Sequence, residues 1–218
     1  MLSKLFLGMS LIGAEWVLYL LVVLSIVSIA VIVERAQFYR SASGGLADFR
    51  RKLRQAVSEA KWTQARELAQ ARLAEARNAG KPADLETEMS FALLEGGGQG
   101  EVSVEKLAET AQDSVLRNRV AWEGKLAILA TIGSNAPFIG LFGTVLGIIK
   151  AFHDLSQQVG GGAQGVTAGI SEALVATGVG ILVAIPAVVA FNLFQRRLKA
   201  GLGEAEALKC FLIGKISR

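Results

Sequence analysis

The sequence predicts an all-α integral membrane protein in which three helices cross the bilayer. Hydrophobic residues make up 52% of its 218 residues, and the mean hydropathy is +0.43. Three stretches carry no charged residue: Trp16 to Val33, Leu126 to Ile149 and Ala173 to Gln195. Since a helix rises 1.5 Å per residue, each can cross a hydrocarbon core about 30 Å thick. We expect the remaining segments to be helical too, extending the helices beyond the membrane.

The first span and the flanking charges predict the orientation. The first charge-free run is longer than the apolar region of a signal peptide, and it ends at Glu34 and Arg35 without a small-residue cleavage site, so we expect a retained anchor. Lys4 is the one basic residue before it, whereas Lys and Arg are frequent after the first and third spans. Such segments stay on the cytoplasmic side. The predicted order is a periplasmic N-terminus with the first span (1–36), a cytoplasmic helical insert (37–125), the second span (126–152), a short periplasmic loop (153–168), the third span (169–195) and a cytoplasmic C-terminal helix (196–218).

The cytoplasmic insert has the pattern of helices separated by turn signals. Good helix formers from Leu46 to Ala79, with apolar residues at three-to-four spacing, predict one helix that an Asn-Ala-Gly-Lys-Pro sequence ends. Asp84 is placed to cap the next helix, and Gly96 to Gly100 breaks the chain again. From Val102 to Lys125 a polar helical pattern leads directly into the second span, so we expect one long protruding helix. The insert packs either on itself or, as its few large hydrophobes favour, against neighbouring copies.

Composition and motifs argue against several functional classes. The net charge is only +4, and the basic residues lie beside the spans, so anionic lipid headgroups are expected partners and nucleic acid is not. Cys210 is the single cysteine, so the chain cannot form an internal disulfide or a cysteine-based metal cluster. Gly160, Gly162 and Gly165 match GxGxxG, but no strand precedes them, so we expect a flexible outer loop. His153, the single histidine, is expected at the membrane surface, with a role in proton access as the alternative. No enzyme, cofactor or metal site is predicted.

Small residues and prolines are concentrated in the second and third spans. Gly143 and Gly147 form a GxxxG pair, and Gly140 lies one turn earlier. Small side chains let helices approach closely in lipid, so these glycines are expected at helix contacts. Pro137 and Pro186 each free a backbone carbonyl, and the ordinary consequence is a kink.

Two threonines and one glutamate are the candidate ion-pathway residues. If the outer ends of the second and third spans are at Lys150 and Ile170, Thr144 lies about 9 Å and Thr177 about 10 Å below the outer surface. Hydroxyls at one depth on neighbouring helices form a polar belt for a water chain or a partner carboxylate. Glu172 is five residues from Thr177, so the two diverge by about 140° around the helix. Because a hydroxyl cannot hold a proton as a charge near neutral pH, either Glu172 titrates or a partner supplies the titrating group.

The clustered motifs resemble a known family. Residues 136–147 read APFIGLFGTVLG and residues 169–177 read GISEALVAT, with AIPA at 184–187 and Asn192 beyond. This set is similar to the MotA/TolQ/ExbB proton-channel family, and the three-span layout is closer to its TolQ/ExbB branch than to the four-span flagellar stators. The resemblance implies a bacterial inner-membrane pentamer around two copies of a single-span, ExbD/TolR-like partner whose transmembrane aspartate carries the proton. It also implies that Thr144 and Thr177 face that aspartate and that Glu172 lines the pore.

The expected function is therefore that of a proton-channel subunit in a motor complex. Such a complex couples the proton motive force to outer-membrane transport, envelope maintenance or gliding. The alternative is a membrane scaffold or signalling subunit without ion conduction, which would not need two threonines at one depth. A lone transporter would be expected to show internal repeats and its own midplane binding site, and the sequence has neither. Proton and sodium both remain open because hydroxyls serve either ion.

Overall fold

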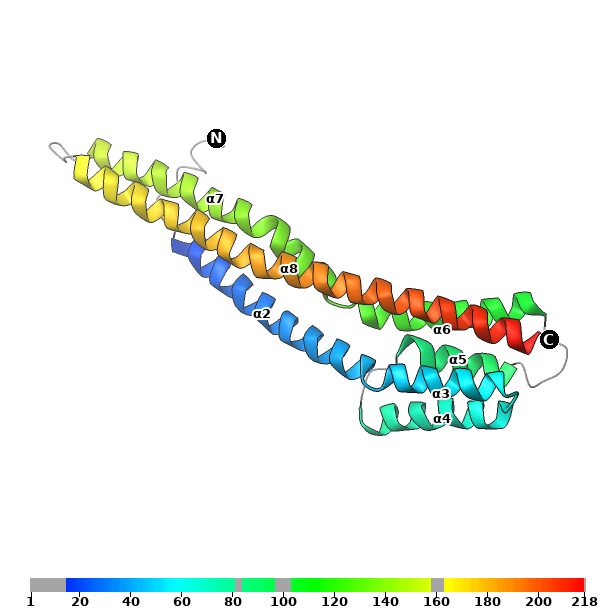
Figure 1. The fold of residues 1–218 in the computed structure, drawn as a ribbon. Helices are drawn as coiled ribbons and strands as arrows, with labels where there is room; N and C mark the ends of the chain where they lie inside the picture. Colours follow the sequence, from blue (N-terminus) through cyan, green and yellow to red (C-terminus); the bar gives the residue numbers. More distant parts are fainter. Residues whose placement is uncertain (1–14, 81–83, 97–102, 158–162, 218) are drawn as a thin grey trace. The chain divides into compact units, whose positions relative to one another are not determined.

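The computed structural model describes residues 15–80, 84–96, 103–157 and 163–217, except for the side chains of residues 163 and 164. The regular structure of these residues is helical (Figure 1). The helices are α2 (Glu15–Ser43), α3 (Leu46–Ser58), α4 (Trp62–Asn78), α5 (Leu85–Gly96), α6 (Val104–Glu123), α7 (Leu126–Gln157) and α8 (Ala163–Ile216). They form two compact units, and α2 and α8 each contribute residues to both.

The first unit contains the apolar helices. It comprises the described residues up to Val33 together with Lys125–Asn192. Three helices are long and apolar enough to cross a membrane, namely α2, α7 and α8, which confirms the predicted all-α fold with three spans. Their shared core is made of small and branched residues: Val17, Leu21, Ile132, Ala136, Leu146, Val183, Ala184 and Ala187. Large apolar side chains such as Tyr19, Phe138 and Leu182 point outward, as lipid or further helices require.

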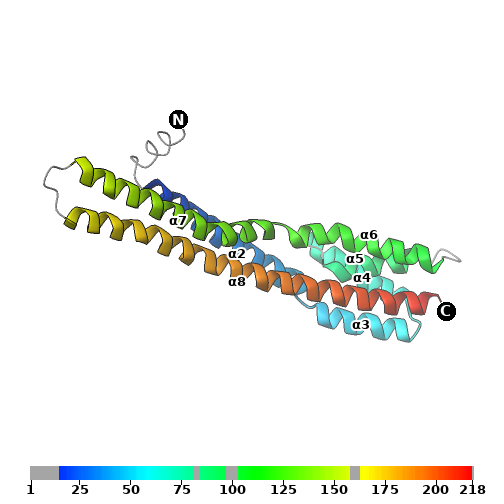
Figure 2. The same ribbon diagram turned by 90° about the horizontal axis from the view of Figure 1, so that it is seen from above.

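Glycines set the distance between α7 and α8, which run side by side in two perpendicular views (Figures 1 and 2). A Cβ atom at Gly140 would lie 2.6 Å from the carbonyl oxygen of Ala176, and one at Gly180 would lie 2.6 Å from that of Ala136. A Cβ atom at Gly143 would lie 2.9 Å from the side chains of Val17 and Ala176. Gly140 and Gly143 therefore pack against helices of the same chain.

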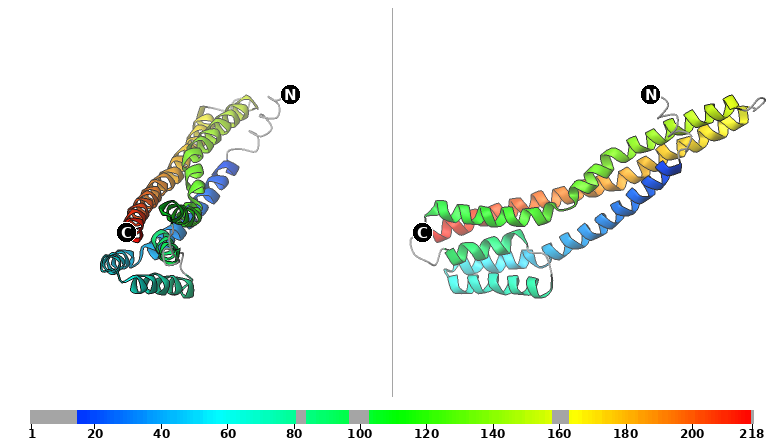
Figure 3. Two further views of the ribbon diagram at one scale, coloured as in Figure 1. Left: turned by 90° about the vertical axis from the view of Figure 1, so that its right-hand side faces the viewer. Right: turned by 180° about the vertical axis from the view of Figure 1, so that it is seen from behind.

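The second unit contains the insert and the end of α8. It comprises Glu34–Gly124 and the described residues from Leu193 onward. Its core joins α3, α4, α5 and α6 to the C-terminal part of α8 (Figure 3), through large side chains such as Leu53, Met89, Leu107 and Leu208. The insert helices thus pack on one another and on the C-terminal part of α8, which supplies Leu208 and Leu212. Packing of the insert against neighbouring copies stays a prediction.

Two breaks divide helices that the sequence predicted as continuous. The segment from Leu46 to Ala79 forms α3 and α4, because Ala60 adopts the left-handed conformation at φ 54°. The helix expected to enter the second span without interruption ends at Glu123, and Lys125 has φ 62° before α7 begins. Neither Ala60 nor Lys125 is a glycine, the residue type that most readily adopts positive φ, so the residue type did not indicate which position would be left-handed.

Other boundaries also differ from the predicted ones. The predicted loop over 153–168 is helical at residues 153–157 and 163–168, and Gly160 and Gly162 lie outside the described residues. The predicted C-terminal helix is not separate, because α8 continues from the third span to Ile216. The predicted cap is confirmed: the Asp84 carboxylate accepts hydrogen bonds from the backbone N–H groups of Glu86 (3.1 Å) and Thr87 (2.7 Å) at the start of α5.

Candidate functional site

A pair of threonine hydroxyls lies at the contact between α7 and α8. Thr144 of α7 is buried, and its Oγ1 is 2.5 Å from Oγ1 of the half-buried Thr177 on α8. The Thr144 Oγ1 is also 3.1 Å from the carbonyl oxygen of Ala173 and 3.2 Å from that of Gly140. The structure therefore brings together the two threonines that the depth calculation placed at one level. Their role in an ion pathway stays a prediction.

The number of protons at this pair limits how it can be bonded. A hydroxyl has one proton to donate and two lone pairs that accept. When Thr144 donates to the carbonyl of Ala173 or Gly140, Thr177 must donate to Thr144. The pair is then a short chain from the Thr177 hydroxyl through Thr144 to a backbone carbonyl. Such a chain orders both side chains and leaves lone pairs of Thr177 for another donor.

The small residues described above make this distance possible. Gly140 lies one turn before Thr144, and Gly180 lies three residues after Thr177. A Cβ atom at Gly140 would be 3.1 Å from the Cα atoms of both Thr177 and Gly180, closer than ordinary carbon–carbon contact. The absence of side chains at these two positions holds the backbones of α7 and α8 close enough for the hydroxyls to meet.

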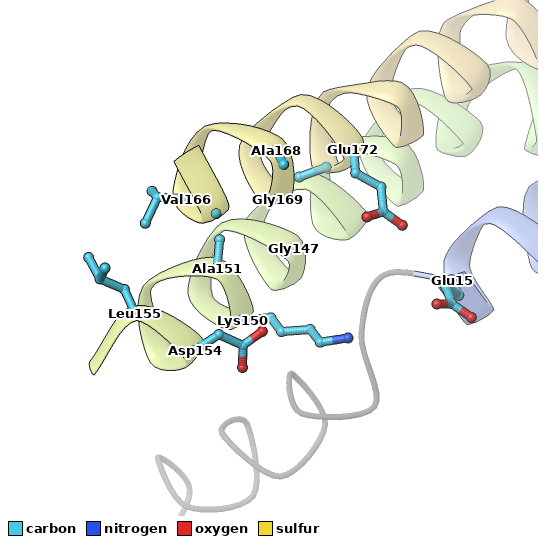
Figure 4. Close-up of a pocket in the computed structure, with 12 residues that line it drawn as sticks. Glu15, Gly147, Lys150, Ala151, Asp154, Leu155, Val166, Ala168, Gly169 and Glu172 are labelled. Atoms are coloured by element: carbon cyan, nitrogen blue, oxygen red, sulfur yellow. The ribbon is translucent and has the colours of Figure 1, made fainter. Parts of the chain in front are cut away.

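Glu172 lies elsewhere on α8. It is exposed and lines a pocket of about 320 Å³ near the junction of α7 and α8, which Thr177 does not line (Figure 4). Glu15 of α2 and both Lys150 and Asp154 of α7 line the same pocket. The divergence of about 140° calculated for an ideal helix explains why Glu172 and Thr177 reach different sides.

The other predicted site residues lie inside the long helices or beside the pocket. Pro137 and Pro186 lie inside α7 and α8 without ending either helix. Gly147 lines the pocket beside Glu172. In the described parts of the chain, no three His, Cys, Asp or Glu side chains come together in a way that could hold a metal ion.

The sequence reasoning missed the charged neighbours of Glu172. It used Lys150 only to mark the outer end of the second span and gave no role to Asp154 or Glu15. Helical spacing contained a signal, because Gly147, Lys150 or Ala151, and Asp154 follow each other at intervals of three to four residues and so share one face of α7. Glu15 lies on α2, so no spacing along α7 or α8 could indicate that it lines the same pocket.

Comparisons with known proteins agree with the motifs at this site. The family model described as the MotA/TolQ/ExbB proton channel family matches residues 49–207. The chain is 40% identical over 100 residues to the Tol-Pal system protein TolQ of Pseudomonas aeruginosa, covering 46% of this chain and 43% of that protein. It is 49% identical over 78 residues to the putative biopolymer transport protein ExbB-like 2 of Helicobacter pylori, covering 36% of this chain and 52% of that protein. It is 45% identical over 100 residues to the biopolymer transport protein ExbB of Salmonella typhimurium, covering 42% and 41%. The alignments thus span about half of each relative or less.

Proposed function

The chain belongs to the MotA/TolQ/ExbB proton channel family, and we propose that it is the proton-channel subunit of a bacterial inner-membrane complex that converts the proton motive force into mechanical work. The work is done through a single-span partner, and the driven process is outer-membrane transport, envelope maintenance or gliding. The subunit assembles as a homopentamer around that partner, with its N-terminus in the periplasm and its C-terminus in the cytoplasm. The names of the relatives, Tol-Pal system protein and biopolymer transport protein, support this class of process.

The observation that carries the proposal is the hydroxyl pair of Thr144 and Thr177, 2.5 Å apart between two membrane-length helices. No Asp, Glu, Lys or Arg occurs in the sequence from Leu126 to Ile149 or from Ala173 to Gln195. Hydroxyls can relay a proton or coordinate an ion, but they do not change charge near neutral pH. The charge-changing group must therefore come from elsewhere, and a partner's transmembrane aspartate facing the pair fits that requirement.

One observation favours the alternative of a scaffold without ion conduction. The Thr144 hydroxyl lies 3.2 Å from the carbonyl of Gly140, four residues earlier in the same helix, which is the ordinary way for a threonine to satisfy itself in a helix. In a scaffold, both hydroxyls would serve only the packing of α7 on α8. The two functions differ in what happens to ion flux when the hydroxyls are removed from an assembled complex.

Valine substitution provides the test. Thr144→Val and Thr177→Val keep the shape of the side chain and remove the hydroxyl, so the complex should assemble while proton flux falls at least about tenfold. The double variant should be little worse than the more severe single one, because groups that act as a unit are not additive. Thr131→Val is the matched control, since Thr131 is an exposed threonine of α7 outside the pair.

The measurement is proton flux, or partner-dependent activity, in cells that contain equal amounts of assembled complex. Glu172→Gln belongs to the same series: it should abolish flux if Glu172 is the proton carrier and only weaken it if Glu172 shapes the field beside the pathway. Full flux in the double valine variant would exclude the hydroxyl pair from the pathway, and absence of flux through the unmodified complex would support the scaffold.

A further inference from the structure

The pocket beside Glu172 is lined by charges of both signs. Figure 4 shows Lys150 and Asp154 extending from α7, Glu172 from α8 and Glu15 at the start of α2, all around one space. The volume of about 320 Å³ is large enough for several water molecules. When all four groups are ionised, three carboxylates and one ammonium group give the pocket a net charge of −2.

These charges need water. Within the described residues, none of the four side chains forms a salt bridge, although surface pairs such as Arg117 with Asp113 do so elsewhere. An ionised group near a membrane that has no direct partner must be hydrated, because the desolvation cost is several kcal/mol. We therefore expect water to fill the pocket.

The floor of the pocket lies next to the threonine pair. Gly147 and Ala173 line it, and the carbonyl oxygen of Ala173 is 3.1 Å from the Thr144 hydroxyl. Ala173 thus faces the pocket and also contacts the hydroxyl pair through its carbonyl oxygen. A proton or cation in the pocket is therefore next to Ala173, whose carbonyl contacts the Thr144 hydroxyl.

We propose that this pocket is the outer water-filled entrance to the ion pathway of each subunit, and that Lys150 is a positioning residue that limits the rate of cation access. The proposal rests on the proposed function and its orientation. The Lys150 ammonium group offsets one of the three carboxylate charges and repels a cation that enters the pocket. Removing that charge should raise the local cation concentration, and keeping it in another side chain should not.

The first test measures access without requiring ion conduction. Cys210→Ser removes the only cysteine of the chain, and Ala168→Cys then places a thiol at an exposed residue of the pocket lining. In spheroplasts, membrane-impermeant cationic and anionic methanethiosulfonates should both react with it from outside. Adding Lys150→Gln should raise the cationic-to-anionic rate ratio about fivefold, since one charge acts oppositely on the two reagents. Lys150→Arg should leave the ratio unchanged.

A matched control separates this local effect from general surface charge. Ser156→Cys places a thiol on an exposed residue of α7 that does not line the pocket, so its ratio should change less than about twofold on Lys150→Gln. No reaction of the Ala168→Cys thiol from outside, or an unchanged ratio with Lys150→Gln, would overturn the proposal.

The second test measures transport. At low ionic strength Lys150→Gln should raise proton flux through the assembled complex about two- to fivefold, Lys150→Arg should match the unmodified chain, and salt should remove the difference. Equal flux in Lys150→Gln and Lys150→Arg would refute the rate-limiting role of Lys150. The two proposals fail differently: if the double valine variant conducts fully while labelling of the pocket follows the expected charge pattern, the threonine pair is excluded from the pathway and the water-filled entrance stands. If the unmodified complex carries no proton flux, the proposed function fails, and the labelling pattern then reports only a charged, water-accessible pocket.

Discussion

Replacing Gly180 with alanine should separate α7 from α8, whereas replacing Gly178, two residues earlier in the same helix, should not. A Cβ atom at Gly180 would lie 2.6 Å from the carbonyl oxygen of Ala136 and 3.0 Å from the Cα atom of Gly140. Carbon–oxygen contacts between helices are ordinarily about 3.3 to 3.6 Å, so the backbones must part by about 0.7 to 1 Å. A Cβ atom at Gly178 meets nothing within 4 Å.

The two variants form a matched pair for measuring this effect. Both gain the same helix propensity from Gly to Ala, so the difference between them isolates the packing contribution. Overpacking of a close contact costs about 1 to 3 kcal/mol, and Gly180→Ala should be less stable than Gly178→Ala by about that amount. The free energy of unfolding is measured by titration with a denaturing detergent, with circular dichroism reporting helix content.

A second readout tests the link from packing to the threonine pair. The hydroxyl oxygens of Thr144 and Thr177 are 2.5 Å apart, and a shift of about 0.7 to 1 Å brings them to or beyond the limit of a normal O–H···O hydrogen bond. Proton flux should therefore fall in Gly180→Ala and stay unchanged in Gly178→Ala. Equal stability and equal flux in the two variants would refute the reasoning, because they would mean that Gly180 is not at a close contact.

Two further predictions concern the charge state of a buried tyrosine and the orientation of the chain. Tyr39 lies beyond the charge-free part of α2, and its burial raises the pKa of its phenol to about 12. The neutral phenol therefore stabilises the fold below about pH 10, and this contribution to the free energy of unfolding is lost as the pH rises toward 12. Tyr19→Phe leaves Tyr39 as the only tyrosine. At pH 11, absorbance at about 295 nm should show about one-tenth ionisation in the folded variant and about nine-tenths after denaturation. Ionisation of the folded protein near pH 10 would contradict the burial argument. Cys210 is exposed, so a membrane-impermeant maleimide should leave it unmodified in spheroplasts and label it after permeabilisation, and labelling of intact spheroplasts would reverse the orientation.

Local rules predicted the spans and the level of the threonine pair, because both depend on counting along a regular helix. The depth of Thr144 and Thr177 and the divergence of Glu172 follow from the rise and rotation per residue alone. The cap at Asp84 was predictable for the same reason, since its partners are two and three residues away. These features need no knowledge of what packs against the helix.

The features that the sequence did not predict depend on contacts between residues far apart in the chain, or on which of two neighbouring residues adopts a positive φ. The core of the insert is completed by Leu208 and Leu212, more than a hundred residues after Phe49 and Leu53 in the same cluster. The break before α7 falls on Lys125 although Gly124 is its neighbour, so composition marked the region and not the residue that adopts positive φ. Glu15 joins the pocket of Glu172 only because α2 packs there, which no pattern within one segment could indicate.

Thr144 and Thr177 have different surroundings, and this difference predicts which of the two single valine variants loses more proton flux. Thr144 is buried and within 3.1 Å of the carbonyl of Ala173, which lines the pocket of Glu172, whereas Thr177 is half-buried and bonds to Thr144. Because Ala173 lines the pocket and its carbonyl contacts Thr144, we expect the route from Glu172 to the pair to begin at Thr144, at the contact between α7 and α8. If Glu172 supplies the pair, Thr144→Val interrupts this route, while Thr177→Val leaves the Thr144 hydroxyl in place for a partner carboxylate. Proton flux should therefore be lower in Thr144→Val than in Thr177→Val at equal amounts of assembled complex, and equal losses would mean that Glu172 does not lie upstream of the pair.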